Sequence, residues 1–240
     1  MVNIMKLGEN ISYKFLEVGK EKTIVIIIDN FLASTAPLIS MAKNRLYSEV
    51  PEECTYPGIR TPLTDLNYLT LVSSTISGIL QKHGFINSQV KFTVDESTFS
   101  LLTTKVQDLD PNHCIPHFDG PEQNRLAVLH YLNVGDFGGT AFYRHRPTQF
   151  ENITADKVEK YVESAQHFAE KHPDTRKGYF TKSSNHFELI NWVNYVANRL
   201  VVYPVSLLHS AFIEQPEKNI DLDPEKGRLT TNIFVSAKAT

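Results

Sequence analysis

The sequence predicts an α+β protein in which antiparallel strands form a sandwich or barrel, supported by N-terminal helices and interrupted by a helical insertion. Three observations lead to this fold class. Short β-branched or alternating runs are separated by glycine turns, helical spacing of apolar residues is concentrated before residue 88, and helical spacing returns between residues 147 and 198.

Length and charge limit the protein class. With 240 residues, 41% of them hydrophobic, the chain is long enough to bury a sizeable core, and we predict one domain over residues 1–240. The 24 basic and 27 acidic residues give a net charge of -3, which provides no electrostatic footprint for nucleic acid or an anionic membrane. Neither is expected as a partner.

The two cysteines, Cys54 and Cys114, form no CxxC pair, so a zinc ribbon or a disulfide framework is not expected, and both should be ordinary buried or half-buried thiols. The first ten residues lack the apolar segment of a signal peptide, and no apolar run approaches the ~18 residues of a membrane span. We therefore expect a soluble cytoplasmic protein.

Residues 1–88 are expected to support the core. The β-branched run 23–29 predicts a strand buried on both faces, and Ser34 or Thr35 before Pro37 predicts the start of a helix. Apolar residues at helical spacing between Thr64 and His83 predict an amphipathic helix, with Gly84 as its C-terminal cap.

The core strands are expected within 89–146 and 199–240. Residues 89–106 alternate with period two and are broken at 95–97, as in a hairpin. Gly138-Gly139 is predicted to form a turn. Further strands are predicted at residues 125–132, 140–143, 199–203 and 228–235.

The insertion at 147–198 is expected to be helical. Apolar residues after Thr154 predict one helix that ends before Pro173, and Asn185 with Glu188 resembles a capping box that would begin a second helix. The insertion is also rich in aromatic residues, for which packing against the strands is the main expectation and a substrate lid or dimer surface the alternative.

The triplet His117-Phe118-Asp119 is the first candidate metal site. On an extended strand, residues two apart point to the same face, about 7 Å apart along the backbone. Pro116 keeps His117 out of a helix interior, which argues against a helical zinc pair of His113 and His117. The alternative is a polar turn, because such triplets arise often by chance.

A third ligand is expected from His209, which ends the strand-like segment 205–209. Two imidazoles and one carboxylate on one face of a metal suit ferrous iron in an oxygenase. The chain has nine histidines, so other candidates for this position stay open, each also explained as a structural histidine: His130, His145 and His186.

Residues 113–236 resemble the iron(II)/2-oxoglutarate-dependent dioxygenase superfamily, most nearly its prolyl-4-hydroxylase-like branch. The resemblance rests on five short motifs, of which the run from Tyr131 to Phe142 is the most specific: Pro-His-Phe-Asp at 116–119, Tyr-Leu-Asn at 131–133, Gly-Gly-Thr-Ala-Phe at 138–142, Leu-His at 208–209 and Arg-Leu-Thr at 228–230. It implies a double-stranded β-helix, the jelly roll of two sheets.

By this resemblance, His117, Asp119 and His209 are the catalytic iron(II) ligands. Arg228 would bind the distal carboxylate of 2-oxoglutarate, because a planar guanidinium forms paired, charge-assisted hydrogen bonds to a carboxylate. Thr230, on the same strand face, would donate a further hydrogen bond.

Tyr131 is a further cosubstrate candidate by the same resemblance. The gap between His209 and Arg228 is long for the family, so Lys226 stays an alternative to Arg228 as the carboxylate clamp.

The resemblance implies an enzyme that uses O2 to oxidise an unactivated C–H bond, with release of succinate and CO2. A carboxylate at Asp119 favours hydroxylation over chlorination, since halogenating relatives replace it with a small residue. The substrate class stays open among amino acids, peptides and small molecules, as does the oligomeric state. The alternative is a cupin-like jelly roll with another metal or none, acting as a binding module.

Substrate contacts are expected after the strand that ends near Phe142. Arg144 and Arg146 would form a basic patch for an acidic group or backbone carbonyls, and Phe142 would lie beside it. A solvated strand end is the equally weighted alternative for the two arginines.

Overall fold

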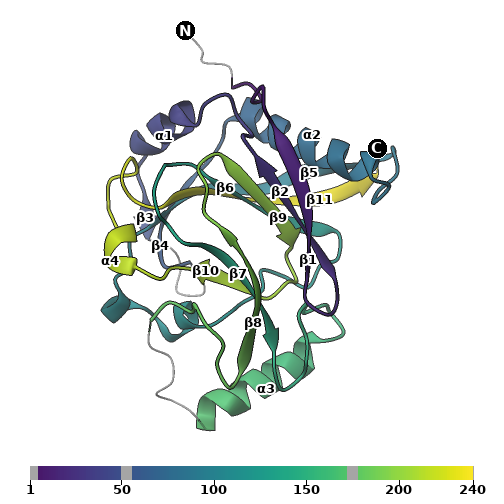
Figure 1. Ribbon diagram of the computed structural model, residues 1–240, viewed down its shortest axis with the longest axis vertical. Coiled ribbons are helices and arrows are strands. Elements are labelled where there is room, and N and C mark those ends of the chain that lie inside the picture. The colour runs from purple at the N-terminus through teal and green to yellow at the C-terminus, as the bar shows by residue number, and fades with distance from the viewer. Residues whose placement is uncertain (1–4, 50–55, 172–177, 240) are drawn as a thin grey trace.

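The computed structural model describes residues 5–49, 56–171 and 178–239 (Figure 1). The helices are α1 Ala36–Lys43, α2 Leu66–Lys82, α3 Val158–Lys171 and α4 Pro216–Asn219, and two short 3-10 helices are Val106–Asp108 and Pro111–Cys114. The strands are β1 Ser12–Val18, β2 Thr23–Asp29, β3 Ser48–Glu49, β4 Gly58–Pro62, β5 Val90–Leu102, β6 Arg125–Tyr131, β7 Gly139–His145, β8 Phe187–Asn194, β9 Arg199–Pro204, β10 His209–Phe212 and β11 Leu229–Ala239.

These strands form two antiparallel sheets. The large sheet has the order β1-β2-β9-β6-β11-β5-β4-β3, and the small sheet has the order β10-β7-β8. His117 adds an isolated bridge to His209 at the other edge of β10. From β5 onward the chain passes repeatedly between the sheets, which is the topology of a double-stranded β-helix. The fold class predicted from the sequence is confirmed.

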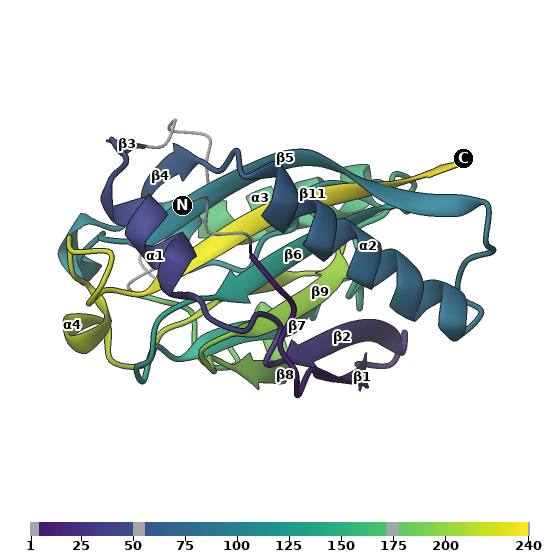
Figure 2. The ribbon, with the colours of Figure 1, turned by 90° about the horizontal axis from the view of Figure 1, so that it is seen from above.

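The layers follow from where apolar residues are buried. One cluster joins α1 and α2 to the outer face of the large sheet, a second fills the space between the sheets, and a third packs Tyr161 of α3 on the outer face of the small sheet. In Figure 1, α1 and α2 lie at the top and α3 at the bottom. Figure 2 shows α2 crossing the large sheet.

The N-terminal predictions are confirmed. In β2, Ile26 and Ile28 face the helices, whereas Val25 and Ile27 face the space between the sheets, so the strand is buried on both sides. Helix α1 starts after Thr35, and α2 is followed by Gly84, whose φ of +72° suits a residue without a Cβ.

The second predicted insertion helix is wrong, because residues 187–194 form β8. This strand pairs with β7 over its whole length, from Phe187 opposite His145 to Asn194 opposite Gly139. Its aromatic and β-branched residues favour a strand, and the backbone hydrogen bonds offered by the open edge of β7 outweigh a local capping pattern. Within the described part of the insertion α3 is the only helix, and the end predicted for it before Pro173 falls at the edge of residues 172–177, which lie outside the described ranges.

The predicted hairpin at residues 95–97 is also wrong. β5 is continuous from Val90 to Leu102, and the polar triplet marks a β-bulge: Phe234 lies opposite Glu96 and Val235 opposite Val94, which leaves Asp95 as the extra residue. Polar residues within an alternating run signal a bulge as well as a turn, and only the pairing with β11 distinguishes the two.

The remaining general predictions have mixed outcomes. Cys114 is buried, as predicted, and Cys54 lies outside the described residues. Among the helices that the structure describes, none has the length and apolar character needed to span a membrane.

Candidate metal centre

His117, Asp119 and His209 come together at one end of the small sheet. His117 and His209 exchange two backbone hydrogen bonds, of 2.9 and 2.8 Å, and the amide of Asp119 donates to the carbonyl of Val205 at 2.8 Å. The segment 117–119 thus runs beside the start of β10, although residue 117 forms only an isolated bridge and not a strand. The sequence prediction that these side chains converge is confirmed.

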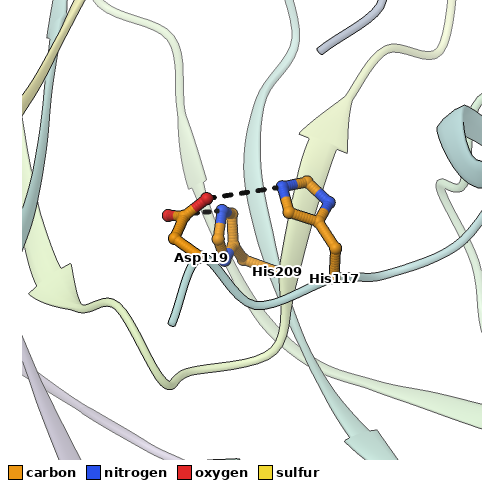
Figure 3. Close-up of side chains that lie close together, drawn as sticks. All are labelled: His117, Asp119 and His209. Atoms are coloured by element: carbon orange, nitrogen blue, oxygen red, sulfur yellow. Dashed lines mark ion pairs between the residues drawn. The ribbon is translucent and has the colours of Figure 1, made fainter. Parts of the chain in front are cut away.

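The side chains present their donor atoms to a common point (Figure 3). His209 Nε2 lies 3.5 Å from Asp119 Oδ2, and His117 Nε2 lies 3.9 Å from Asp119 Oδ1. Two metal–ligand bonds of about 2.0–2.2 Å span up to about 4.4 Å. The donor separations therefore suit three ligands of one ion. The His117 and Asp119 side chains are 23% and 19% exposed, so one side of the group is open to a ligand.

The hydrogen bond of His209 sets its tautomer. Its Nδ1 lies 2.8 Å from the carbonyl oxygen of Leu207. Because a carbonyl only accepts, Nδ1 carries the proton and the lone pair of the neutral ring is on Nε2, the atom that faces Asp119. A backbone carbonyl that orients the imidazole in this way is the usual outer support of a metal-binding histidine.

Burial controls the charges at this site. The pKa of His117 is lowered well below its usual value, first by burial and then by the nearby His209 and Arg60, so its ring is neutral and able to ligate. Burial raises the pKa of Asp119, while His209 and Arg60 act in the opposite direction. A bound cation would stabilise the carboxylate, so this donor set suits a divalent metal.

A cavity of about 330 Å³ opens from the metal ligands into the space between the sheets. Besides the ligands, it is lined by residues of six other strands (β4, β5, β6, β7, β9 and β11) and of connecting segments. The polar lining residues include Arg60, Arg125, Thr140, Tyr179, Arg228 and Thr230. The volume lies within the range of small-molecule sites.

Arg228 lies in this cavity, as predicted, and is only 2% exposed. Its Nε and Nη2 donate to the carbonyls of Phe137 and Gly139 at 3.2 and 3.1 Å, and its guanidinium carbon lies 5.7 Å from the centre of the Tyr131 ring. These contacts orient the guanidinium but supply no negative charge, and no carboxylate among the described residues forms an ion pair with it.

The other two cosubstrate candidates differ. Thr230 lines the cavity, with its hydroxyl 2.9 Å from Asn232 Oδ1. Tyr131 is not among the lining residues, because its hydroxyl is 2.6 Å from Thr140 Oγ1 and its ring stacks on Tyr195 at 4.4 Å. Its position beneath Arg228 supports the arginine instead of reaching a ligand.

The predicted substrate contacts are not part of the cavity. Arg144 is held by ion pairs to Glu151 and Glu188, which satisfy its charge away from the metal ligands. Arg146 is exposed and donates to the carbonyl of Ser184. Phe142 is fully buried in the apolar cluster between the sheets, 5.5 Å from the Tyr203 ring. The structure therefore places these three side chains outside the cavity, because the partners of each are supplied by distant parts of the chain.

The alternative histidines have structural positions. His130 lies between Tyr68 and Asn198 on the helix-facing side of the large sheet, and His145 and His186 contact each other through their Nε2 atoms beyond β7. Lys226, the alternative to Arg228, pairs with Asp223 at 3.5 Å and does not line the cavity.

Several cavity residues were missed by the sequence analysis, among them Tyr203 and Arg60. Tyr203 lies 4.8 Å, ring to ring, from His209, and the alternation of the strand 199–203 was the available signal for its inward direction. Arg60, on β4, lines the cavity beside the metal ligands. No motif surrounds it in the sequence, so only the pairing of β4 with β5 shows where it points.

Comparison with known proteins identifies a family and a similar solved structure. No curated protein sequence matches the chain. Among solved structures, the chain is similar to HygX from Streptomyces hygroscopicus with nickel and 2-oxoglutarate bound, at 12% identity and a TM-score of 0.48, over 90% of this chain and 84% of that one. The sequence profile of a family of unknown function (DUF6445) matches residues 9–235. The chain therefore belongs to the DUF6445 family.

Proposed function

We propose that this protein is an iron(II)- and 2-oxoglutarate-dependent oxygenase that hydroxylates a C–H bond of an organic substrate. The proposal rests on the combination of two features in one cavity: a His-Asp-His group able to hold a divalent metal, and the buried cation of Arg228. The first alone would also suit a zinc site.

Arg228 is the observation that carries the proposal. A buried charge is costly unless a charge of opposite sign compensates it, and the described residues provide no ion-pair partner. Two of its five N–H groups bind backbone carbonyls, which leaves the others for a ligand. A carboxylate is the anion whose geometry fits the guanidinium fork.

The metal ligands and Arg228 line the same cavity, which favours a dicarboxylate as the ligand. Thr230 and the metal ligands line the same cavity as Arg228, which allows one small molecule to contact both ends. A 2-oxo acid group at the metal and a second carboxylate at Arg228 would satisfy both charges. 2-Oxoglutarate has this structure.

Iron(II) with bound cosubstrate supplies activation of O2. In the overall reaction, R–H, 2-oxoglutarate and O2 give R–OH, succinate and CO2, with one oxygen atom entering the substrate and the other entering succinate. His117, Asp119 and His209 hold the metal, Arg228 and Thr230 hold and orient the cosubstrate, and Tyr203 covers the ring of His209. Asp119 would supply a carboxylate ligand where halogenating relatives carry a small residue, so hydroxylation is the proposed outcome.

Anaerobic titration tests this proposal. Metal-free protein is loaded with iron(II) under nitrogen and then titrated with 2-oxoglutarate, and we expect a visible metal-to-ligand charge-transfer band. Asp119→Ala should abolish the band, because two imidazoles alone hold iron weakly. Admission of air to the wild-type complex should then produce succinate.

The control is His83→Ala, which removes an exposed histidine on the far side of the large sheet and should leave the band unchanged. Wild-type protein that binds the metal but shows neither the band nor succinate would favour the cupin-like binding module over the oxygenase.

A further inference from the structure

We propose that Arg60 is an anion-binding subsite that holds a carboxylate of the substrate next to the metal ligands. This inference rests on the proposed function and deepens it, because it narrows the substrate to a small carboxylic acid. It is carried by the position of Arg60 in the large sheet, by the absence of an ion-pair partner for it among the described residues and by its separation from Arg228.

Strand pairing places Arg60 on the cavity side. Arg60 lies opposite Ser100 of β5, and Ser100 lies opposite Thr230 of β11, so the three residues form one row across the sheet. Residues in one row of a sheet point to the same face. Since Thr230 lines the cavity, Arg60 points into it as well, and both are lining residues.

Arg60 also has the electrostatic character of a binding residue. Its Nε is buried and has no hydrogen-bond partner within the described part of the chain, and its guanidinium carbon lies 4.7 Å from the centre of the Tyr56 ring. The ring fixes the cation without neutralising it. A desolvated donor without a partner is costly, so the site is completed by an anion.

The acidic groups of the cavity are already engaged. Asp119 belongs to the metal-binding group, and Glu96 accepts a 2.8 Å hydrogen bond from Arg125, which also faces Asp95 at 3.6 Å. No ion pair within 4.0 Å joins Arg60 to any carboxylate in the described ranges.

Arg60 and Arg228 serve two different anions. Arg60 lies on β4 and Arg228 directly precedes β11, and β5 separates these two strands, which places them about 10 Å apart. The guanidinium of Arg60 lies over the ring of Tyr56, whereas that of Arg228 lies over the rings of Tyr131 and Tyr195. With Arg228 assigned to the cosubstrate, Arg60 remains for the molecule to be oxidised.

The size of the cavity limits that molecule. About 330 Å³ must accommodate the cosubstrate and the reacting part of the substrate, and small-molecule sites begin at about 300 Å³. A compact carboxylic acid fits this space, with its carboxylate at Arg60 and a neighbouring C–H bond directed to the metal.

The first experiment needs neither iron nor 2-oxoglutarate. Metal-free wild-type protein, Arg60→Met and Arg60→Lys are titrated by calorimetry with propionate, benzoate and N-acetyl-L-alanine, each paired with its primary amide. We expect wild-type protein to bind the acids and not the amides. The affinity for the acids should be about 30-fold lower in Arg60→Met. It should be intermediate in Arg60→Lys, because lysine keeps the positive charge but lacks the paired N–H donors of a guanidinium. Arg45→Met, an exposed arginine beyond α1, should match wild type.

The second experiment uses protein loaded with iron(II) and 2-oxoglutarate. Free L-amino acids and other small acids are compared with their amides as stimulators of succinate release. We expect stimulation to be confined to acids and their KM to rise about 30-fold in Arg60→Met, with a much smaller change in the affinity for 2-oxoglutarate.

Three results would overturn the inference: unchanged acid binding in Arg60→Met, amides that bind as well as acids, or no acid binding to wild type. Equal losses of 2-oxoglutarate and acid affinity would also overturn it, because Arg60 would then belong to the cosubstrate clamp. The titration of metal-free protein is decisive even if iron and 2-oxoglutarate do not bind, so failure of the proposed function is distinguished from failure of this subsite.

Discussion

At the scale of single residues, three arginines show how partners decide roles. Arg144 is buried among carboxylates and is structural, whereas Arg60 and Arg228 line the cavity and form no ion pair with a carboxylate of the described residues. The charge of a buried guanidinium is compensated when a carboxylate pairs with it, whereas a guanidinium without a carboxylate partner favours the binding of an anionic ligand. Arginine therefore has a structural role at one position and a proposed ligand-binding role at the others.

Glu151 should be important for stability through Arg144. Its side chain is 0% exposed, and it accepts hydrogen bonds from Arg144 Nε at 2.7 Å and from the amides of Lys20 and Glu21 at 2.9 Å each. We expect Glu151→Gln to lower the free energy of unfolding by about 3 kcal/mol, measured by urea denaturation, because it removes the buried counter-charge of Arg144 and leaves this cation to the partly exposed Glu188. Glu188→Gln, at a side chain that is 36% exposed, should cost less than about 1 kcal/mol. Similar losses in the two variants would contradict this account.

His130 should make the protein sensitive to acid. Burial lowers its pKa from 6.5 to about 4, so the unfolded chain takes up a proton at a higher pH than the native protein. Its contribution to stability is complete above pH 6.5 and is lost as the pH falls toward 4. We expect this residue to account for about 2 kcal/mol of the decrease in unfolding free energy between pH 7 and pH 5.

Urea denaturation at both pH values measures this effect. His130→Phe should reduce the decrease, whatever its stability at pH 7, whereas His83→Phe, at an exposed position, should retain it. An undiminished decrease in His130→Phe would show that other groups cause the acid sensitivity.

At the scale of elements, the turn before β7 positions the strand that carries His209. Gly138 has a φ of +70°, and a Cβ built on it would lie 1.8 Å from the carbonyl oxygen of Phe212, at the end of β10. The chain therefore approaches β10 at a point where only glycine fits.

Gly138→Ala should consequently destabilise the protein by about 2 kcal/mol or more and weaken metal binding, because β10 must move away from β7. Gly78→Ala is the matched control. Gly78 lies within α2 with nothing near the added methyl group, so this substitution should stabilise the protein by about 0.5–1 kcal/mol. Thermal unfolding and iron titration of both variants provide the measurement, and a Gly138→Ala protein as stable as wild type would refute the close approach.

At the scale of the whole molecule, ligands should bind the folded protein alone, because the site combines residues 117–119 with residues 203–230. Iron(II) with 2-oxoglutarate at about 100 times its Kd should add about 2.7 kcal/mol to stability. For a chain of this size, that corresponds to a rise in Tm of about 5–10 °C. Anaerobic thermal scans should show the rise in wild type and none in Asp119→Ala, and an equal rise in both would place the binding elsewhere.

Comparison of sequence and structure shows where local patterns are reliable. Three elements were predicted correctly: the helix 64–83, the strand 23–29 and the strand 125–132. Each buries apolar residues whose spacing within the element itself indicates its secondary structure. Residues 185–196 were predicted incorrectly, because the pairing partner of β8 is β7, more than 40 positions away, and local capping residues carry no information about it.

The sequence by itself determined the chemistry that is possible: two imidazoles, a carboxylate and Arg228, recognisable because few residue types bind metals and carboxylates. Tertiary structure decided which charged groups remain available for ligands. Arg144 forms an ion pair with Glu151, whereas no ion pair joins Arg60 to a carboxylate of the described residues, and this difference depends on which distant strands lie together. The burial of these side chains and the pairing of their strands are established only when the two sheets pack together, so no local sequence pattern predicts them.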